Sequence, residues 1–222
     1  MGKNDLSLVG PIKGKTFLEI GCGSGHSVKY LIKHGAKKVY ALDISDTQLE
    51  LARKLNAKAV KEGRAIFVQS PMEKKIKIPA VDTVFSIYAM GWATDPLKVF
   101  KNAHSYLKPG GQFTWSWGHK MFSDIKGESG RMHAERSYFD ESPRSFANFE
   151  NAGPASYSRL KPSTWFTLMQ KAGFEVTRFV EAEPANLREN IKSRSKRMGV
   201  YYSPTRGALL PSTVIFSGKK NL

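Results

Sequence analysis

Three glycines within five positions follow a short apolar run near the start of the chain, in the stretch FLEIGCGSG from Phe17 to Gly25. A strand that ends in G-x-G-x-G and leads into a helix brings backbone N–H groups and the positive helix end to one place, where a ligand can touch bare backbone. The dinucleotide fingerprint is G-x-G-x-x-G, so the third glycine comes one residue early here. We therefore expect a nucleotide-like cofactor, with a nicotinamide dinucleotide as a poorer fit.

A carboxylate ends the next apolar run, KKVYALD. Asp43 follows Gly25 by 18 positions. A carboxylate there can accept hydrogen bonds from both hydroxyls of a ribose. Asp43 could instead be an acid that stabilises the start of the next helix. Ser45 and Asp46 already fill that role. We expect Asp43 to bind the sugar of the cofactor.

Residues that could contact or act on a substrate follow the fourth and fifth expected strands. Tyr88 and Trp92 come after the fourth, and Trp117 and His119 after the fifth. Ligands of open α/β sheets collect at these strand ends, so we expect all four to face the substrate. His119 is the first candidate for a general base and Tyr88 a second catalytic candidate. The alternatives stay open: a loop histidine is often a hydrogen-bonding residue, and Tyr88 and Trp92 suit a pocket wall.

Strands and helices alternate along the chain at a spacing that predicts the fold. Strands are expected at 16–21, 37–43, 65–69, 81–90, 107–117, 174–183 and 212–220, and helices at 26–35, 45–60, 95–107 and 162–173. Ser45 with Gln48 forms a capping box, Asp95 precedes Pro96, and Ser163 is expected to cap the last helix. We predict a single α/β domain over 1–222 with a doubly wound, Rossmann-like sheet, mostly parallel with an antiparallel C-terminal edge strand.

One long segment, 119–161, lacks the hydrophobic periodicity that is typical of a helix or a strand. It lies between the fifth strand and the helix at 162–173, and it is polar and aromatic. A structureless segment of this length inside a compact domain is usually functional. We expect a lid or substrate-binding insertion.

Composition excludes several classes of protein. The single cysteine, Cys22, rules out an intrachain disulfide, and the five histidines lack metal-site spacing, so no metal is expected. No apolar run approaches a membrane span and the N-terminus lacks a signal core, which predicts a cytoplasmic protein without membrane insertion. The net charge of +16 is densest at 188–206. A generic lysine-rich surface explains this excess of positive charge somewhat better than a nucleic-acid-binding tract does. The sequence does not indicate an oligomeric state.

Five pieces of the sequence occur in a family's order between residues 16 and 118: FLEIGCGSG, YALD, SPMEK, VDTVFSIYAM and LKPGGQF. With them the chain resembles the class I S-adenosylmethionine-dependent methyltransferases, in particular the small-molecule branch of the ubiquinone and menaquinone methyltransferases. The resemblance implies S-adenosyl-L-methionine as cofactor, S-adenosyl-L-homocysteine as product and a small-molecule acceptor. It implies that Glu19, Gly21, Gly23 and Gly25 frame the methionine moiety, with Cys22 as a small residue of the same cofactor-binding loop. It also implies that Asp43 holds the ribose and that Ile44, Met72 and Glu73 border the adenine. Ser86 to Tyr88 are implied to lie near the methyl group, with Ser86 as a cofactor contact.

Two departures leave alternatives open. Pro71 stands where the family often has Asp or Asn, and only about 15 residues precede the first strand. They suggest a non-catalytic cofactor-binding module as one alternative. The charge suggests an RNA or other polyanion methyltransferase as another, although SIYAM replaces the N/D-P-P-Y/F motif of nucleic-acid amino-methylation.

Overall fold

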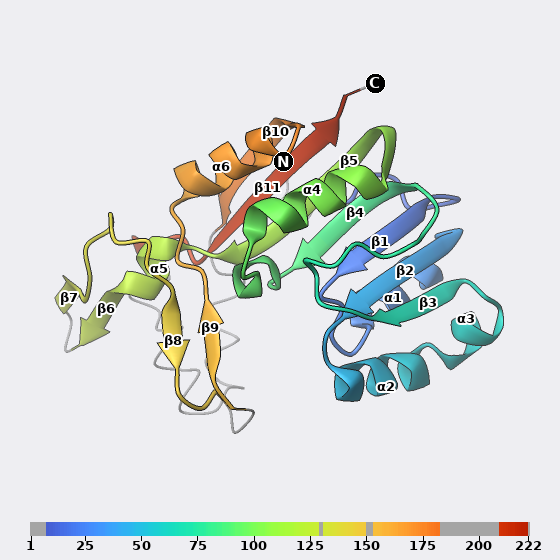
Figure 1. The fold of residues 1–222 in the computed structure, drawn as a ribbon, viewed down its shortest axis with the longest axis horizontal. Coiled ribbons are helices and arrows are strands. Elements are labelled where there is room, and N and C mark those ends of the chain that lie inside the picture. The colour runs from blue at the N-terminus through green and yellow to red at the C-terminus, as the bar shows by residue number, and fades with distance from the viewer. Residues whose placement is uncertain (1–7, 129–130, 150–152, 183–208, 222) are drawn as a thin grey trace.

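One seven-stranded sheet forms the centre of the protein. The computed structural model describes residues 8–128, 131–149, 153–182 and 209–221. The strand order is β10-β11-β5-β4-β1-β2-β3 (Figure 1). The strands are β1 (Thr16–Ile20), β2 (Lys38–Asp43), β3 (Ala65–Gln69), β4 (Val81–Ile87), β5 (Leu107–Gly118), β10 (Phe174–Ala182) and β11 (Thr213–Lys220).

The pairing within the sheet confirms the predicted fold class. Strands β1 to β5 are parallel, and β11 pairs antiparallel with both β5 and β10. The antiparallel pair lies at the C-terminal edge of a mostly parallel sheet. The C-terminal strand β11 is second from that edge, because β10 pairs on its outer side.

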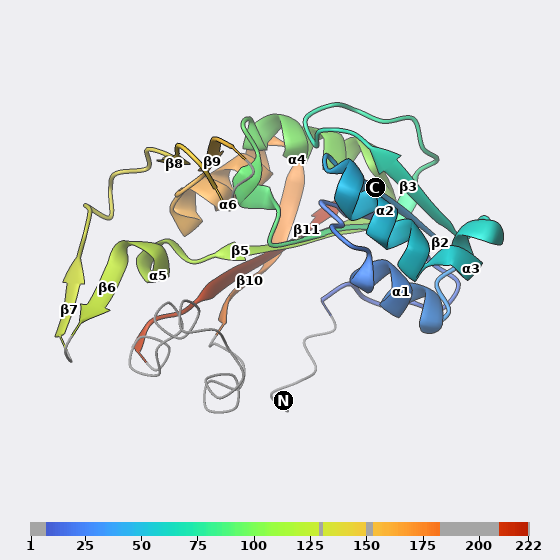
Figure 2. The ribbon, with the colours of Figure 1, turned by 90° about the horizontal axis from the view of Figure 1, so that it is seen from below.

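Helices cover both faces of the sheet. The helices are α1 (His26–Lys33), α2 (Asp46–Leu55), α3 (Ala57–Lys61), α4 (Pro96–Tyr106) and α6 (Pro162–Lys171). Alternate strand residues point to opposite faces, so Leu18 packs in the core with α4 and α6, whereas Phe17 packs in the core with α1 and α2. Figure 2 shows α4 and α1 on opposite sides of the sheet.

Two of the three predicted helix caps are confirmed. Ser45 Oγ accepts from the Gln48 N–H (3.3 Å) and Asp95 Oδ1 from the Lys98 N–H (3.0 Å). The Ser163 prediction was wrong: α6 begins with Pro162 after Lys161, without a side-chain cap. Proline suits the first helical position because its missing N–H would have no helical partner there.

The expected helix over 45–60 is interrupted. Buried Asn56 separates α2 from α3, and its Nδ2 donates to Ala52 O (2.9 Å) and to Gly25 O (3.0 Å). The second bond reaches the glycine turn and is not visible in a local sequence pattern. The fourth strand is also shorter than expected, since β4 ends at Ile87 and a short 3₁₀ helix, η1 (Met90–Trp92), follows.

The segment 119–161 contains more regular structure than its sequence suggests. A short helix, α5 (Lys120–Asp124), is followed by two hairpins, β6 (Ile125–Glu128) with β7 (Arg131–Ala134), and β8 (Arg144–Phe146) with β9 (Ala155–Tyr157). Both hairpins project beyond the C-terminal end of β5 (Figure 1). These strands have only three or four residues, too few to show a period. A lid function for this insertion stays a prediction.

A buried ion cluster connects the two ends of this insertion. Asp124 lies between two cations: its Oδ2 is 2.9 Å from Lys120 Nζ, and its Oδ1 accepts from Arg159 Nε (2.9 Å). Lys120 Nζ also donates to Asp140 O (2.6 Å). The Lys120 and Arg159 side chains are only 0% and 2% exposed, so their charges depend on this partner.

Candidate functional site

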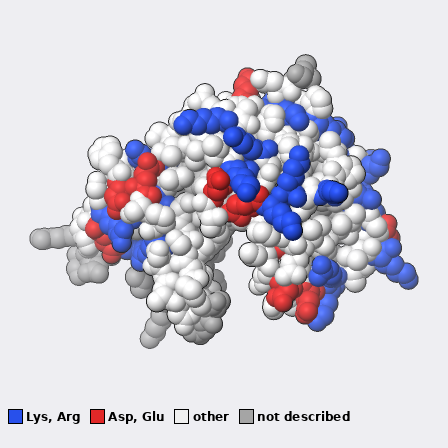
Figure 3. All heavy atoms as spheres, in the orientation of Figure 1, with Lys and Arg blue, Asp and Glu red and all other residues white. Residues whose placement is uncertain are grey.

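A cavity of about 470 Å³ opens at the C-terminal ends of β1 to β4. Its walls come from the turns after four strands, which parallel pairing brings to one edge. Figure 3 shows the surface hollowed between the part that carries β8 and β9 and the part that carries α2. The lining residues are Gly21, Gly23, Leu42, Asp43, Ile44, Ser70, Pro71, Met72, Glu73, Ile87, Tyr88, Ala89, Trp92 and Thr94.

The glycines of the first turn have two different roles. Gly21 has φ +73°, and a Cβ there would lie 2.3 Å from the Ala89 Cβ; Gly25 has φ +77° and would clash with Ala52 in the same way. These two glycines let the turn pack closely against its neighbours. At Gly23 the nearest atom to an added Cβ is Gln48 Oε1 at 3.8 Å, and this residue lines the cavity. Gly23 therefore exposes bare backbone to the cavity, which Gly21 also lines.

The Asp43 carboxylate is held rigidly at the cavity wall. Its Oδ2 accepts from the Gly23 N–H (2.8 Å), and its Oδ1 accepts from the Ser45 N–H (3.0 Å). Each carboxylate oxygen has a further lone-pair direction available. The arrangement can accept the two hydroxyls of a ribose without a change of side-chain conformation, as the sequence analysis expects.

Glu19 lies fully buried at the end of β1, next to the glycine turn. Its Oε2 has no hydrogen-bond partner among the described residues. Burial raises the pKa of Glu19 to about 8 and the nearby Asp43 charge adds to this, whereas a hydrogen bond with Ser27 opposes it. A carboxyl group with an unpartnered oxygen fits a site that takes a polar or cationic group of a ligand.

The stability of the protein should depend on pH through Glu19. Because its folded pKa of about 8 exceeds the unfolded value of 4.5, the folded state binds the extra proton between these values. The stabilisation is complete below about pH 4.5 and is lost as the pH rises to about 8, by up to about 1.4 kcal/mol per pH unit. We expect Glu19→Gln to remove this component in urea unfolding at a series of pH values. Exposed Glu50→Gln is the control, and an equal effect of both variants would contradict the assignment.

Three other candidate cofactor residues lie behind the cavity wall. Gly25, Cys22 and Ser86 are buried and do not line the cavity. Ser86 Oγ donates to Ile20 O (2.7 Å), which ties β4 to β1. Burial raises the pKa of the Cys22 thiol, so it stays protonated. Ile44, Met72 and Glu73 do line the cavity, and Glu73 Oε1 also accepts from the Thr94 N–H (2.8 Å).

Tyr88 has an unusual backbone conformation at the end of β4. Its φ is +54°, and among the described residues no other non-glycine residue has a positive φ. Its hydroxyl contacts Thr213 Oγ1 of β11. Strained conformations of this kind concentrate at functional sites. This conformation turns the chain from β4 toward η1, and Tyr88 lines the cavity.

Trp92 lines the cavity beyond Tyr88, and further aromatic side chains pack around it. Trp92 contacts Trp117 (5.9 Å between ring centroids), and both contact Tyr157 of β9. Phe149 also packs on Trp92, at 5.1 Å. A Cβ at Gly91 would lie 1.8 Å from the Trp117 ring, so this glycine makes room for the indole. The insertion therefore supports the cavity wall through Trp92.

Sequence analysis did not single out Phe149 and Tyr157. Trp117, which it did, supports Trp92 from behind and does not line the cavity itself. The many aromatic residues of 119–161 were a sign that this segment could contact the substrate-binding region. Only the tertiary structure shows which of these rings contact Trp92.

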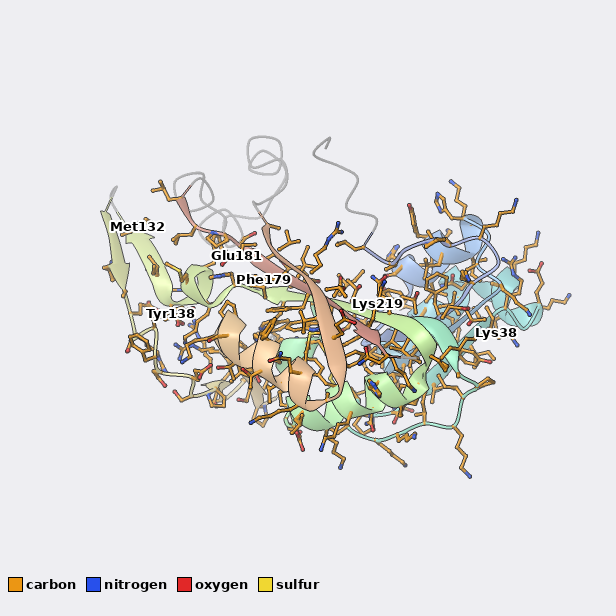
Figure 4. The ribbon with its side chains drawn as sticks, turned by 90° about the horizontal axis from the view of Figure 1, so that it is seen from above. Lys38, Met132, Tyr138, Phe179, Glu181 and Lys219 are labelled. Atoms are coloured by element: carbon orange, nitrogen blue, oxygen red, sulfur yellow. The ribbon has the colours of Figure 1, made fainter. Side chains whose placement is uncertain are left out.

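His119 lies away from the cavity. Its ring is 1% exposed, its Nε2 is 2.9 Å from Glu181 Oε1, and its Nδ1 accepts from the Met121 N–H (3.1 Å). Figure 4 labels Glu181 near the end of β10, close to α5. Burial lowers the pKa of His119, and Glu181 opposes that shift. Both nitrogens are engaged, which suits a cap of α5 better than a base.

The comparisons with known proteins agree with this geometry. Residues 18–115 match the model of a methyltransferase domain. The structure is similar to that of an S-adenosylmethionine dependent methyltransferase from Mesorhizobium loti (TM-score 0.78, 20% identity, 96% of this chain and 94% of that one). It is also similar to a geranyl diphosphate methyltransferase in complex with SAM (TM-score 0.71, 15% identity, 97% and 82%). These likenesses show the fold.

A curated relative, the tRNA U34 carboxymethyltransferase of Haemophilus influenzae, is 31% identical over 92% of this chain and 64% of its own length. The chain covers less than two thirds of the length of this relative and of the other curated relatives with the strongest matches. The domain match over residues 18–115 supports an enzyme of the methyltransferase kind with S-adenosyl-L-methionine as its cofactor. The narrower resemblance to the ubiquinone and menaquinone branch stays a prediction.

Membrane-spanning helices and metal-binding clusters are both absent from the described residues. Within the described ranges, no helix has the length and apolar character of a membrane span. The same residues contain no group of three or more His, Cys, Asp or Glu side chains that could hold a metal ion.

Proposed function

We propose that this protein is an S-adenosylmethionine-dependent methyltransferase. The observation that carries the proposal is a single cavity that joins the fixed Asp43 carboxylate, the bare Gly23 backbone and an aromatic wall. Asp43 would hold the ribose, Ile44 and Met72 the adenine, and the turn at Gly21 and Gly23 the methionine moiety, with Glu19 behind it. Bound there, S-adenosylmethionine supplies an electrophilic methyl group on its sulfonium.

For this reaction the protein mainly has to align the acceptor with the methyl group and to exclude water from the site. Reactive side chains are less important. An in-line displacement is accelerated mainly when the acceptor atom is held near the methyl group in a dry site. Tyr88 and Trp92 are in position to orient the acceptor. Tyr88 lines the cavity, whereas His119 does not, and both ring nitrogens of His119 have partners elsewhere. Tyr88 is therefore the second catalytic candidate that stays at the cavity, and its hydroxyl would have to exchange Thr213 for the acceptor to take part in proton transfer.

RNA is the acceptor that we place first. The similarity to a tRNA-modifying enzyme extends over 92% of this chain, well beyond the cofactor-binding half. RNA-modifying enzymes commonly take a base out of its stack and hold it against aromatic side chains, which the wall at Trp92 offers. The sequence alone favours a small molecule, so the similarity changes the order of the two candidates.

A small molecule of aromatic or apolar character is the second candidate. The wall beyond Asp43 is lined by Ile87, Tyr88, Ala89 and Trp92, which suit a flat, neutral group of any origin. Salt separates the two candidates, because binding to RNA weakens steeply between low and moderate salt whereas binding of a neutral molecule does not.

The proposal is tested by methyl transfer from radiolabelled S-adenosylmethionine. The full chain is incubated with total RNA and, separately, with a small-metabolite extract. We expect label in RNA, and nucleoside mass spectrometry then shows whether the added group is methyl. Label only in metabolites would overturn the RNA acceptor, and tight cofactor binding without label in either pool would overturn the proposed activity.

A further inference from the structure

Two chain segments at the rim of the cavity carry five lysines. Lys74, Lys75 and Lys77 lie in the connection between β3 and β4, and Lys98 and Lys101 lie on α4. All five are exposed. Among the residues that the structure describes, none of them forms an ion pair. We call this set the α4 lysine surface.

Hydrogen bonds hold the two segments side by side. Asn102 Nδ2 of α4 donates to Glu73 O (2.9 Å) and Met72 O (3.3 Å), and the Ile76 N–H donates to the Tyr106 hydroxyl (2.8 Å). The connection therefore lies along α4, and its lysines share one face with those of the helix. Figure 3 shows Lys and Arg side chains gathered over this region.

The acidic residues of these segments do little to neutralise the surface. Residues 71–80 and 94–106 contain two carboxylates, Glu73 and Asp95. Glu73 Oε1 accepts from the backbone and hydroxyl of Thr94, and Asp95 Oδ1 accepts from the Lys98 N–H. Both serve local structure. By contrast Lys15 and Lys108, at the other end of the strands, share the partner Asp82.

The α4 lysine surface begins where the cavity opens. Met72 and Glu73 precede its first lysine and line the cavity, as does Thr94, which lies two positions before α4. A nucleic-acid strand along α4 would therefore bring a base within reach of the wall at Trp92. Unpaired lysines bind phosphates by releasing condensed counterions, a contribution that does not depend on sequence.

We propose that the α4 lysine surface binds the phosphate backbone of a single-stranded RNA acceptor while the target base enters the cavity. The proposal rests on the proposed methyl transfer to RNA and assigns the contact surface for it. The densest basic stretch of the sequence, 188–206, lies outside the described residues.

The test compares two charge reversals of equal size in the full chain. Lys98→Glu with Lys101→Glu alters the α4 lysine surface, and Lys29→Glu with Lys33→Glu alters exposed positions of α1, across the sheet. The probe is a fluorescent oligouridylate, titrated from low to moderate salt. We expect the α4 variant to lose about tenfold or more of its affinity at low salt and to lower the slope of log affinity against log salt by about 1 to 2. The α1 variant should stay within about threefold.

Cofactor binding by calorimetry separates this proposal from the proposed function. We expect both variants to bind S-adenosylmethionine as the unaltered protein does. Equal losses in the two variants, or unchanged RNA affinity in the α4 variant, would overturn the proposal. Binding to vesicles of anionic phospholipid that depends on the α4 lysines, without RNA binding, would also overturn it. RNA binding that needs these lysines, with no methyl transfer, would support the surface and refute the activity.

Discussion

Replacement of Asp43 by alanine should weaken the binding of S-adenosylmethionine by about 100-fold or more, because charge-assisted hydrogen bonds are worth about 1.5–3 kcal/mol each and two would be lost at the ribose. The change also removes the acceptors of the Gly23 and Ser45 N–H groups. The glycine turn would then lose a contact that sets its position at the cavity. Isothermal titration with the cofactor and with S-adenosylhomocysteine measures the effect.

Two further variants make this prediction specific. In Asp43→Asn the amide must present its NH₂ group to one of two backbone N–H donors, so we expect a loss nearly as large. Asp46→Ala removes an exposed acid that, within the described part of the chain, bonds with its neighbour Thr47. It should leave affinity within about twofold, since exposed acids contribute little. If Asp43→Ala binds the cofactor as tightly as the unaltered protein, Asp43 does not hold the ribose.

The local motifs were predictable from the sequence because their physics is local. The caps at Ser45 and Asp95 depend on residues three positions apart, and the glycine turn and Asp43 each stand at the end of a short apolar run. The parallel sheet follows from the alternation of strands and helices. These features are enough to place the cofactor end of the cavity at the edge where β1 to β4 end.

The features that sequence analysis missed depend on partners far away in the chain. His119 has a loop sequence around it, but Glu181 lies 62 positions further on and binds its ring. Asn56 ends a helix because it reaches Gly25, 31 positions earlier. The hairpins of the insertion have no period of their own, and Asp124 holds Arg159 across 35 positions. Only the tertiary structure shows these pairs.

The buried ion cluster explains how such short hairpins keep one position. A buried charge without a partner is strongly unfavourable, so the structure that joins Lys120 and Arg159 to Asp124 excludes arrangements in which they separate. Ser158, next to Arg159, donates its N–H to Gly91 O (2.7 Å) and accepts from Trp117 Nε1 (3.3 Å). The cluster is thereby linked to the aromatic wall through one peptide unit.

Replacement of Asp124 by alanine should lower the free energy of unfolding by about 3–5 kcal/mol, because it leaves two buried cations without their shared partner. Urea denaturation followed by circular dichroism measures it. Asp140→Ala is the matched control: this carboxylate is more exposed and lies 3.7 Å from Arg159 Nη1, so we expect a much smaller loss than in Asp124→Ala. A similar loss in both variants would mean that Lys120 and Arg159 reach water when Asp124 is absent. Trp fluorescence gives a second readout, since a displaced Ser158 would release the Trp117 indole and redden its emission before global unfolding.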